Sequence, residues 1–199
     1  MTKIKLCGMM RSSDVTTAVK LGADYVGFVL TAGYRRSVGA GELQLMLDSI
    51  AESSVKKVGV FVDEPIENII KYYADVLDMI QLHGSEDDLY IRRLRELAGK
   101  PVIKSFTVRT EGDVEDALKS SADFVLLDSG KGTGRTFDHS LIKDLSRPYF
   151  LAGGLNAENV SGMIAALHPY AVDASSGIET EGYKDKCKMA AFVDAVRKG

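Results

Sequence analysis

Two residues combine a reactive side chain with a position where chemistry could take place. Cys7 ends the strand-like run Lys3–Cys7 and is followed by Gly8, and Asp128 comes directly after four apolar residues. A thiol near cations ionises readily, and a partly buried carboxylate can keep its proton near neutral pH. Each residue also has a plainer interpretation. A free cysteine is commonly an inert buried side chain, and an aspartate after a strand commonly caps the next turn.

Small residues follow the last two strand-like runs. Gly153-Gly154 comes after a run ending at Ala152, and Ser175-Ser176-Gly177 comes shortly after Asp173. Backbone N–H groups in such segments can approach an anion closely, so together they predict a phosphate site. Gly-Gly alone is also typical of a simple tight turn.

Other polar residues are weaker candidates. His83 follows a strand-like run, whereas His139 and His168 fall where helices begin or end. Arg36 could bind a carboxylate or phosphate, although an arginine in a loop is often only solvated. The segment 130–134 is rich in glycine and suits a loop that folds over a ligand. No cluster has the spacing of metal ligands, so we expect no metal site.

The elements that must position these residues alternate between strands and helices. Strand-length apolar runs recur eight times, with about 25 residues per unit. This alternation predicts a single-domain α/β fold over residues 1–199, a closed (β/α)8 TIM barrel with eight parallel strands and outer helices. The expected strands are Lys3–Cys7, Tyr25–Leu30, Lys57–Phe61, Met79–Leu82, Val102–Ser105, Phe124–Asp128, Tyr149–Ala152 and Ala171–Asp173.

The barrel places its active site at the carboxyl ends of the strands. Period-two alternation puts Lys5 on the same side of its strand as Cys7. For the helices, Ser13 and Asp14 are expected to cap the first, Asn156 is expected to cap the seventh, and the last is expected over Lys184–Lys198.

Composition narrows the possible partners. The chain has 199 residues and a net charge of -3, which gives no electrostatic footprint for nucleic acid or an anionic membrane. Two cysteines are too few for a disulfide framework, and no apolar run is long enough to span a membrane. We therefore expect a cytoplasmic protein, a monomer or homodimer, that binds a small molecule.

The motifs at the strand ends, taken in order, resemble the phosphoribosylanthranilate isomerase family over the chain from Lys3 to the last helix. They are Lys5-Leu6-Cys7-Gly8, Gly27-Phe28-Val29, Val58-Gly59-Val60-Phe61, Gln81-Leu82-His83-Gly84, Leu127-Asp128-Ser129, Gly132-Thr133-Gly134 with Phe137-Asp138, Ala152-Gly153-Gly154-Leu155, and Ser175-Ser176-Gly177-Ile178-Glu179. The stretch with Gly182, Lys184 and Asp185 also fits.

The resemblance implies an Amadori rearrangement of N-(5-phosphoribosyl)anthranilate, a phosphosugar, in tryptophan biosynthesis, without a metal or organic cofactor. It assigns Cys7 as general base and Asp128 as general acid. Arg36 would hold the anthranilate carboxylate. Arg35 is the alternative, because the sequence here is Tyr34-Arg35-Arg36 where the family usually has Ser-Pro-Arg. The implied phosphate ligands are Gly153, Gly154, Ser175, Ser176 and Gly177, and His83 and Asp173 are further substrate-binding candidates.

Other small phosphosugar barrels are the nearest alternatives. A ribulose-phosphate epimerase would need metal-binding histidines and aspartates at several strand ends, and indoleglycerol-phosphate synthase would need lysines and glutamates. A histidine-pathway isomerase would place aspartates after strands one and five, where this chain has Cys7 and the segment 105–107. A phosphosugar-binding protein without turnover is the alternative from another class, and such a protein needs neither Cys7 nor Asp128.

Overall fold

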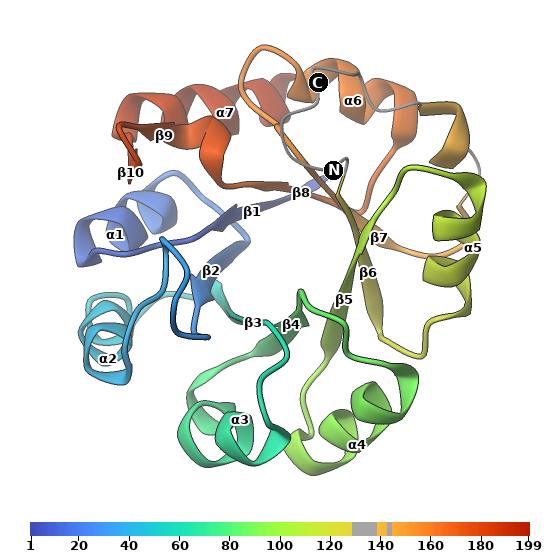
Figure 1. The fold of residues 1–199 in the computed structure, drawn as a ribbon. Helices are drawn as coiled ribbons and strands as arrows, with labels where there is room; N and C mark the ends of the chain where they lie inside the picture. Colours follow the sequence, from blue (N-terminus) through green and yellow to red (C-terminus); the bar gives the residue numbers. More distant parts are fainter. Residues whose placement is uncertain (129–138, 143–144) are drawn as a thin grey trace.

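Eight parallel strands close into a barrel in sequence order, with β1 hydrogen-bonded to β8 (Figure 1). The computed structural model describes residues 1–128, 139–142 and 145–199. The predicted single-domain (β/α)8 barrel is confirmed, and the strand ends lie within two residues of those expected. The strands are β1 (Lys3–Cys7), β2 (Tyr25–Val29), β3 (Lys56–Phe61), β4 (Met79–Leu82), β5 (Val102–Thr107), β6 (Phe124–Asp128), β7 (Tyr149–Ala152) and β8 (Ala171–Ala174).

Helices surround the barrel and cover the outer faces of its strands (Figure 1). In the described part of the chain an α-helix follows every barrel strand except β6, after which the described residues form the short 3-10 helix η2 (His139–Ile142). None of these helices is long and apolar enough to cross a membrane. The helices are α1 (Ser12–Lys20), α2 (Ala40–Asp48), α3 (Ile66–Tyr72), α4 (Asp88–Ala98), α5 (Glu111–Lys119), α6 (Val160–Leu167) and α7 (Lys186–Lys198), with 3-10 helices η1 (Ala74–Val76) and η3 (Ser176–Ile178).

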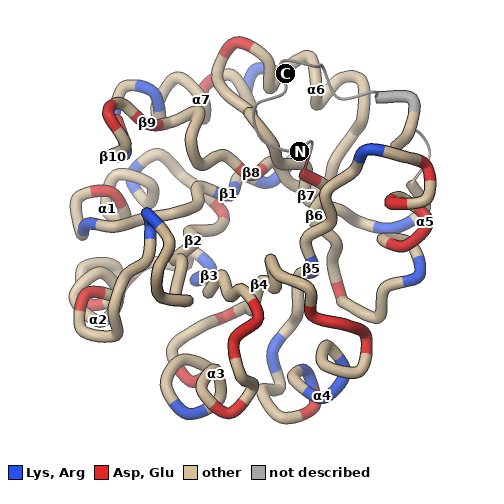
Figure 2. Tube along the Cα trace, in the orientation of Figure 1, with Lys and Arg blue, Asp and Glu red and all other residues tan. Residues whose placement is uncertain are grey.

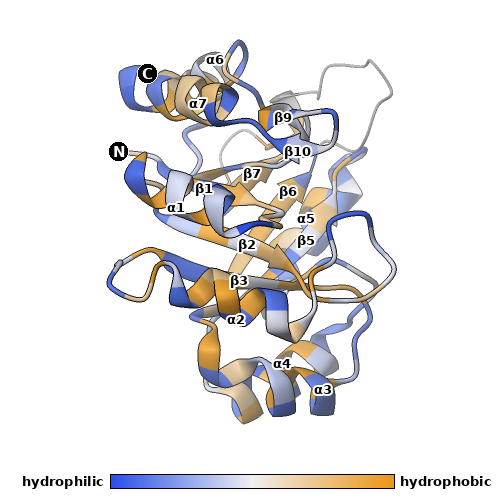
Figure 3. Cartoon of the chain, turned by 90° about the vertical axis from the view of Figure 1, so that its left-hand side faces the viewer, coloured by the Kyte–Doolittle hydropathy of each residue, from blue (hydrophilic) through white to orange (hydrophobic). Residues whose placement is uncertain are grey.

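Alternation along each strand separates the hydrophobic core from the interior of the barrel. In β1, Ile4 and Leu6 are fully buried in the core between strands and helices, whereas Lys5 and Cys7 point the other way. The same pattern in β8 directs Asp173 inward. Hydrophobic residues are concentrated on the strands, and hydrophilic ones on the connecting loops and outer helix surfaces (Figure 3).

An apolar plug fills the amino-terminal part of the barrel interior. Phe150 lies at its centre, with ring centroids 5.4 Å from Tyr25 and 5.7 Å from Phe124. Side chains from seven strands complete this cluster: Tyr25, Val58, Met79, Ile103, Leu126, Phe150, Ala152 and Ala171. Because this end is filled, the polar interior residues are left at the carboxyl ends of the strands.

The final helix begins later than its sequence predicts. Lys184 was expected inside it, but this residue belongs to a two-stranded antiparallel hairpin, β9 (Glu179–Thr180) and β10 (Tyr183–Lys184). The prediction was wrong because Asp185 ends the hairpin and caps α7, its carboxylate accepting hydrogen bonds from the backbone N–H groups of Cys187 and Lys188 at 2.9 and 3.1 Å.

Two predicted caps also differ in detail. The N-cap of α1 is Arg11, and Asp14 bonds back to the Arg11 backbone N–H at 3.2 Å as the third helical residue. Helix α6 starts after Asn159, because Asn156 uses its side chain to accept from the N–H of that residue in the preceding turn. The predicted loop 130–134 lies outside the described residues.

Candidate active site

A cavity of about 540 Å³ opens at the carboxyl ends of the strands. Every residue predicted for the site lines it, and these residues come from the loops or ends of β1, β2, β4, β6, β7 and β8. The lining also includes apolar side chains of β2, β3 and β6. The candidates brought together are Cys7, Arg36, His83, Asp128, Gly153, Gly154, Asp173, Ser175, Ser176 and Gly177, with Arg35 and Gln81 beside them.

Cys7 is held at the end of β1 in a space left by a neighbouring glycine. Its partner across the β1–β2 pair is Gly27. A Cβ atom added to Gly27 would lie 2.5 Å from the Cys7 Sγ and 3.2 Å from the Cys7 Cα. Only glycine therefore allows the thiol its position in the cavity wall, where Cys7 keeps 7% of its surface exposed.

A buried ion pair lies next to the thiol. Lys5 has no exposed surface, and its Nζ is 2.8 Å from Asp173 Oδ2 across the β1–β8 pair. Burial lowers the pKa of Lys5, but the attraction of Asp173 and Cys7 outweighs it and the pKa is raised. Burial raises the pKa of the Cys7 thiol, Lys5 and Lys184 oppose this rise, and Asp173 adds to it.

Two buried oxygens in the described residues lack a hydrogen-bond partner, and both belong to residues lining the cavity. They are Oδ1 of Asp173 and Oε1 of Gln81. A buried acceptor without a partner costs about 1–3 kcal/mol, so these oxygens are suited to accept hydroxyl donors from a ligand. A sugar is a ligand that carries such donors.

Asp128 and His83 face the cavity from β6 and from the loop after β4. Burial lowers the pKa of His83, and the nearby Asp128 carboxylate partly offsets this. The Gln81 amide nitrogen is 3.3 Å from His83 Nδ1. With the Gln81 amide nitrogen as donor, Nδ1 accepts, and a neutral ring in this arrangement carries its proton on Nε2.

The loops after β7 and β8 meet in close contact. A Cβ atom on Gly177 would lie 2.0 Å from the Leu155 carbonyl oxygen, so this approach requires glycine. Ser175 joins the β8 loop to β1, because its Oγ donates to the Cys7 carbonyl oxygen at 3.1 Å. The predicted phosphate ligands are thereby fixed against each other and against the end of β1.

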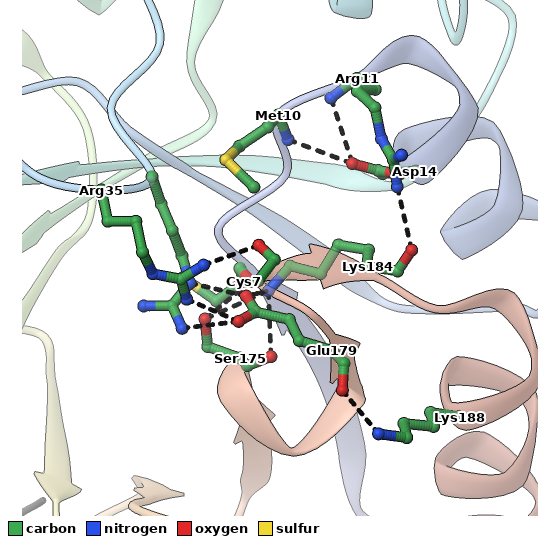
Figure 4. A network of polar contacts seen from close by, with 11 residues as sticks. Cys7, Met10, Arg11, Asp14, Arg35, Ser175, Glu179, Lys184 and Lys188 are labelled. Atoms are coloured by element: carbon green, nitrogen blue, oxygen red, sulfur yellow. Dashed lines mark hydrogen bonds and ion pairs between the residues drawn. The ribbon is translucent and has the colours of Figure 1, made fainter.

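Glu179 gathers three cations at the rim of the cavity (Figure 4). Its carboxylate accepts from Arg36 Nε and Arg35 Nη2, each at 2.6 Å, and from Lys184 Nζ at 2.7 Å. Although burial raises the pKa of Glu179, these hydrogen bonds dominate and lower it to about 2. Arg36 is 19% exposed and Arg35 is 52% exposed, so Arg36 is the deeper of the two arginines.

Charge is unevenly shared around this cavity. Lysines and arginines are spread over the helices and loops outside the barrel, but a group of them also converges near β1, β8 and the β9–β10 hairpin (Figure 2). The cations there are Lys5, Arg35, Arg36 and Lys184, and the carboxylates that line the cavity or pair with these cations are Asp128, Asp173 and Glu179. This excess positive charge favours an anionic ligand.

A second cavity of about 530 Å³ lies outside the apolar plug, among the residues that precede β2, β3 and β8. It is lined by residues that begin the strands, among them Asp24, Tyr25 and Tyr170. Its carboxylate, Asp24, already binds Lys3 Nζ at 2.8 Å, and the two tyrosine hydroxyls bond each other at 3.0 Å. The hydrogen-bonding groups of Lys3, Asp24, Tyr25 and Tyr170 are therefore paired with one another.

Sequence reasoning did not assign a role to three of the polar residues around the cavity. Gln81 and Glu179 stand inside motifs quoted for their neighbours, and Lys184 stands five residues beyond Glu179. Period-two alternation would have placed Gln81 inside the barrel, on the same face as Met79. No local signal joins Glu179 to Arg36, because the pair is separated by 143 positions.

A closed parallel eight-stranded barrel with glycine- and serine-rich loops after β7 and β8 is an architecture typical of enzymes that bind phosphorylated substrates. The family model for N-(5'-phosphoribosyl)anthranilate isomerase matches residues 4–195. The chain belongs to this family, as its motifs predicted, and isomerisation is the activity of the family.

Relatives cover the whole chain. The N-(5'-phosphoribosyl)anthranilate isomerase of Endomicrobium trichonymphae is 40% identical over 203 residues, covering 99% of both chains. A phosphoribosyl anthranilate isomerase structure from Thermotoga maritima superposes with a TM-score of 0.90 at 36% identity over 100% of both chains. A phosphoribosyl anthranilate isomerase structure solved in complex with reduced 1-(o-carboxyphenylamino)-1-deoxyribulose 5-phosphate gives a TM-score of 0.88 at 35% identity over 100% of both chains.

Proposed function

We propose that this chain converts N-(5-phosphoribosyl)anthranilate to 1-(2-carboxyphenylamino)-1-deoxyribulose 5-phosphate, with Asp128 as general acid and Cys7 as general base. The observation that carries this proposal is that both residues line one cavity, with β7 and β8 between their strands. The whole chain, residues 1–199, forms the catalytic domain.

The reaction needs a proton transfer at each of two sugar atoms that are bonded to the anomeric carbon, the ring oxygen and the adjacent carbon. Asp128 donates a proton to the furanose ring oxygen, the bond from that oxygen to the anomeric carbon breaks, and the nitrogen lone pair forms an iminium ion. The Cys7 thiolate then takes the proton of the adjacent carbon. The C–H electron pair becomes the C=C bond of an enolamine, the iminium electrons return to nitrogen, and tautomerisation gives the ketone.

Groups around the acid and base are suited to hold the two unreactive ends of the substrate. The anthranilate carboxylate is assigned to Arg36, which lies deeper than Arg35 and is already oriented by Glu179. The phosphate is assigned to the backbone of Gly153, Gly154, Ser175, Ser176 and Gly177. Anchoring both ends fixes the reacting carbons between acid and base.

The sugar hydroxyls are assigned to the remaining polar groups of the cavity. Asp173 Oδ1 is buried, has no hydrogen-bond partner among the described residues, and supplies an acceptor. His83 supplies a donor, because its neutral ring carries the proton on Nε2.

The decisive experiment is turnover of freshly generated phosphoribosylanthranilate, followed by its fluorescence. We expect Cys7→Ala and Asp128→Asn each to lower kcat by about a hundredfold to ten thousandfold, the range for general acid-base catalysis. Cys187→Ser is the matched control, because this exposed cysteine lies in α7 and should leave turnover unchanged. Retention of wild-type kcat by a folded Cys7→Ala protein would exclude the assigned base.

The oligomeric state and the cellular location are inferred from the cysteines, the net charge and one relative. Both cysteines are free thiols, which agrees with a reducing cytoplasm, and the net charge of -3 argues against nucleic acid as a partner. A Thermotoga maritima relative is described as a dimeric enzyme from which monomers were generated. The present chain is accordingly assigned as a homodimer or a monomer, which sedimentation would decide.

A further inference from the structure

Lys184 places a charge deep inside the protein. Its side chain has no exposed surface, although it comes from the short hairpin strand β10. The ammonium donates to Glu179 Oε1 at 2.7 Å, to the Ser175 carbonyl oxygen at 3.0 Å and to Ser175 Oγ at 3.2 Å. These contacts use the donors of the ammonium and fix its position.

A single hydroxyl connects this ammonium to the residue assigned as base. Ser175 Oγ accepts from Lys184 and donates to the Cys7 carbonyl oxygen at 3.1 Å, so the three residues form a chain (Figure 4). Lys184 also interacts electrostatically with the Cys7 thiol. Loss of this lysine would therefore change both the position and the electrostatic surroundings of Cys7.

The charge of Lys184 is less offset than that of the other lysine beside Cys7. Lys5 forms a one-to-one ion pair with Asp173. The partner of Lys184 is Glu179, and this carboxylate also binds Arg35 and Arg36. A carboxylate shared among three cations cancels only part of each charge. The three cations that share Glu179 therefore keep part of their positive charge, and Lys184 is the one linked to Cys7 through Ser175.

We propose that Lys184 is a positioning residue for Cys7: its ammonium, fixed by Glu179 and Ser175, supplies the buried positive charge against which the Cys7 thiolate forms. The proposal rests on the assignment of Cys7 as base. The thiol proton leaves to water, and the thiolate then accepts the proton from the sugar carbon. Two other charged groups act on the Cys7 thiol: Lys5 from β1 lowers its pKa by charge and by a hydrogen bond, and Asp173 from β8 raises it. The remaining titratable groups that line the same cavity are Arg35, Arg36, His83 and Asp128.

The test measures thiolate directly and needs no turnover. In a Cys187→Ser background only Cys7 remains to react, and its alkylation by iodoacetamide is followed by intact mass as a function of pH. Only the thiolate reacts, so the rate at neutral pH reports the ionised fraction. We expect Lys184→Met to slow alkylation at neutral pH about tenfold, equivalent to about one pH unit in the midpoint. Equal plateau rates at high pH would show unchanged access to the thiol.

Two further variants protect this test against a simple folding defect. Lys188→Met is the matched control, because Lys188 binds the Glu179 backbone oxygen at 2.6 Å from the exposed side of the same hairpin. It should leave the alkylation profile unchanged. Glu179→Gln removes the anion beside Lys184 and should act in the opposite direction, speeding alkylation several-fold at neutral pH.

Each outcome decides the question. A slower Lys184→Met protein together with a faster Glu179→Gln protein supports the proposal. An unchanged midpoint in Lys184→Met, or equal slowing in the Lys188→Met control, overturns it. Should Lys184→Met fail to fold, slower or unchanged alkylation of Glu179→Gln overturns it instead. Absence of wild-type turnover would refute the proposed function while leaving the alkylation result readable.

Discussion

Gly27→Ala tests whether the position of Cys7 depends on the empty space beside it. The added methyl group would begin 2.5 Å from the Cys7 Sγ, whereas unstrained carbon contacts lie at about 3.5–4.0 Å. The thiol must then move by about 1 Å. We expect the overpacking to cost about 2 kcal/mol of unfolding free energy and the displacement to lower kcat about a hundredfold.

A double-mutant cycle isolates the steric contact. In a Cys7→Ala background the sulfur is absent, so Gly27→Ala should lower the unfolding free energy by about 1 kcal/mol or less. This remaining cost comes from the 3.2 Å approach of the new Cβ to the β1 backbone. Urea unfolding gives these values. Gly162→Ala in α6 is the control, because its Cβ meets nothing within 4 Å and should stabilise the helix by about 0.5–1 kcal/mol. The reasoning fails if Gly27→Ala costs the same free energy in both backgrounds or leaves kcat intact.

Three other predictions follow from individual contacts. The pKa of Glu179 is lowered from 4.5 to about 2, so its ionised form stabilises the fold above pH 4.5 and this stabilisation is lost as the pH falls toward 2. Measured against pH, the unfolding free energy should fall by about 2 kcal/mol over this range in the wild type, and this fall should be absent in Glu179→Gln. Arg147 donates to the carbonyl oxygens of Ala117 and Ser120 at 3.0 and 2.9 Å. Arg147→Met should therefore lower the unfolding free energy measured in urea by about 2 kcal/mol, and an unchanged urea midpoint of unfolding would contradict this role. Arg36→Ala should raise KM at least about tenfold more than Arg35→Ala, and the reverse order in steady-state kinetics would assign the carboxylate to Arg35.

The barrel was predictable from the sequence because its signals are local. Continuous apolar runs such as Phe124–Leu127 mark strands that are covered on both faces, and their number and spacing set the closed topology. Cys7 and Asp128 could be placed at one end of the barrel for the same reason, since each directly ends a run and parallel strands share an orientation.

Contacts between distant segments were not predictable in this way. Lys184, the last residue of the β9–β10 hairpin, was interpreted as the start of the final helix because it fits the helical pattern that follows. Its place in the hairpin is shown by its pairing with Glu179 and by its contact with the Ser175 carbonyl oxygen. Likewise, Gly27 has no motif that reveals its purpose. Its purpose becomes visible only when β1 lies alongside β2 and the Cys7 sulfur occupies the space that a side chain would need.

The closure of the barrel between β1 and β8 has a consequence for the order in which the site assembles during synthesis. Lys5 reaches Asp173, and Cys7 reaches Ser175, across 168 positions in each case. The first strand leaves the ribosome long before these partners exist. Until the β8 segment has joined, a nascent chain carries Cys7 without the neighbouring Asp173 and Ser175. The surroundings in which Cys7 is assigned as the base therefore form only at the last step of barrel assembly.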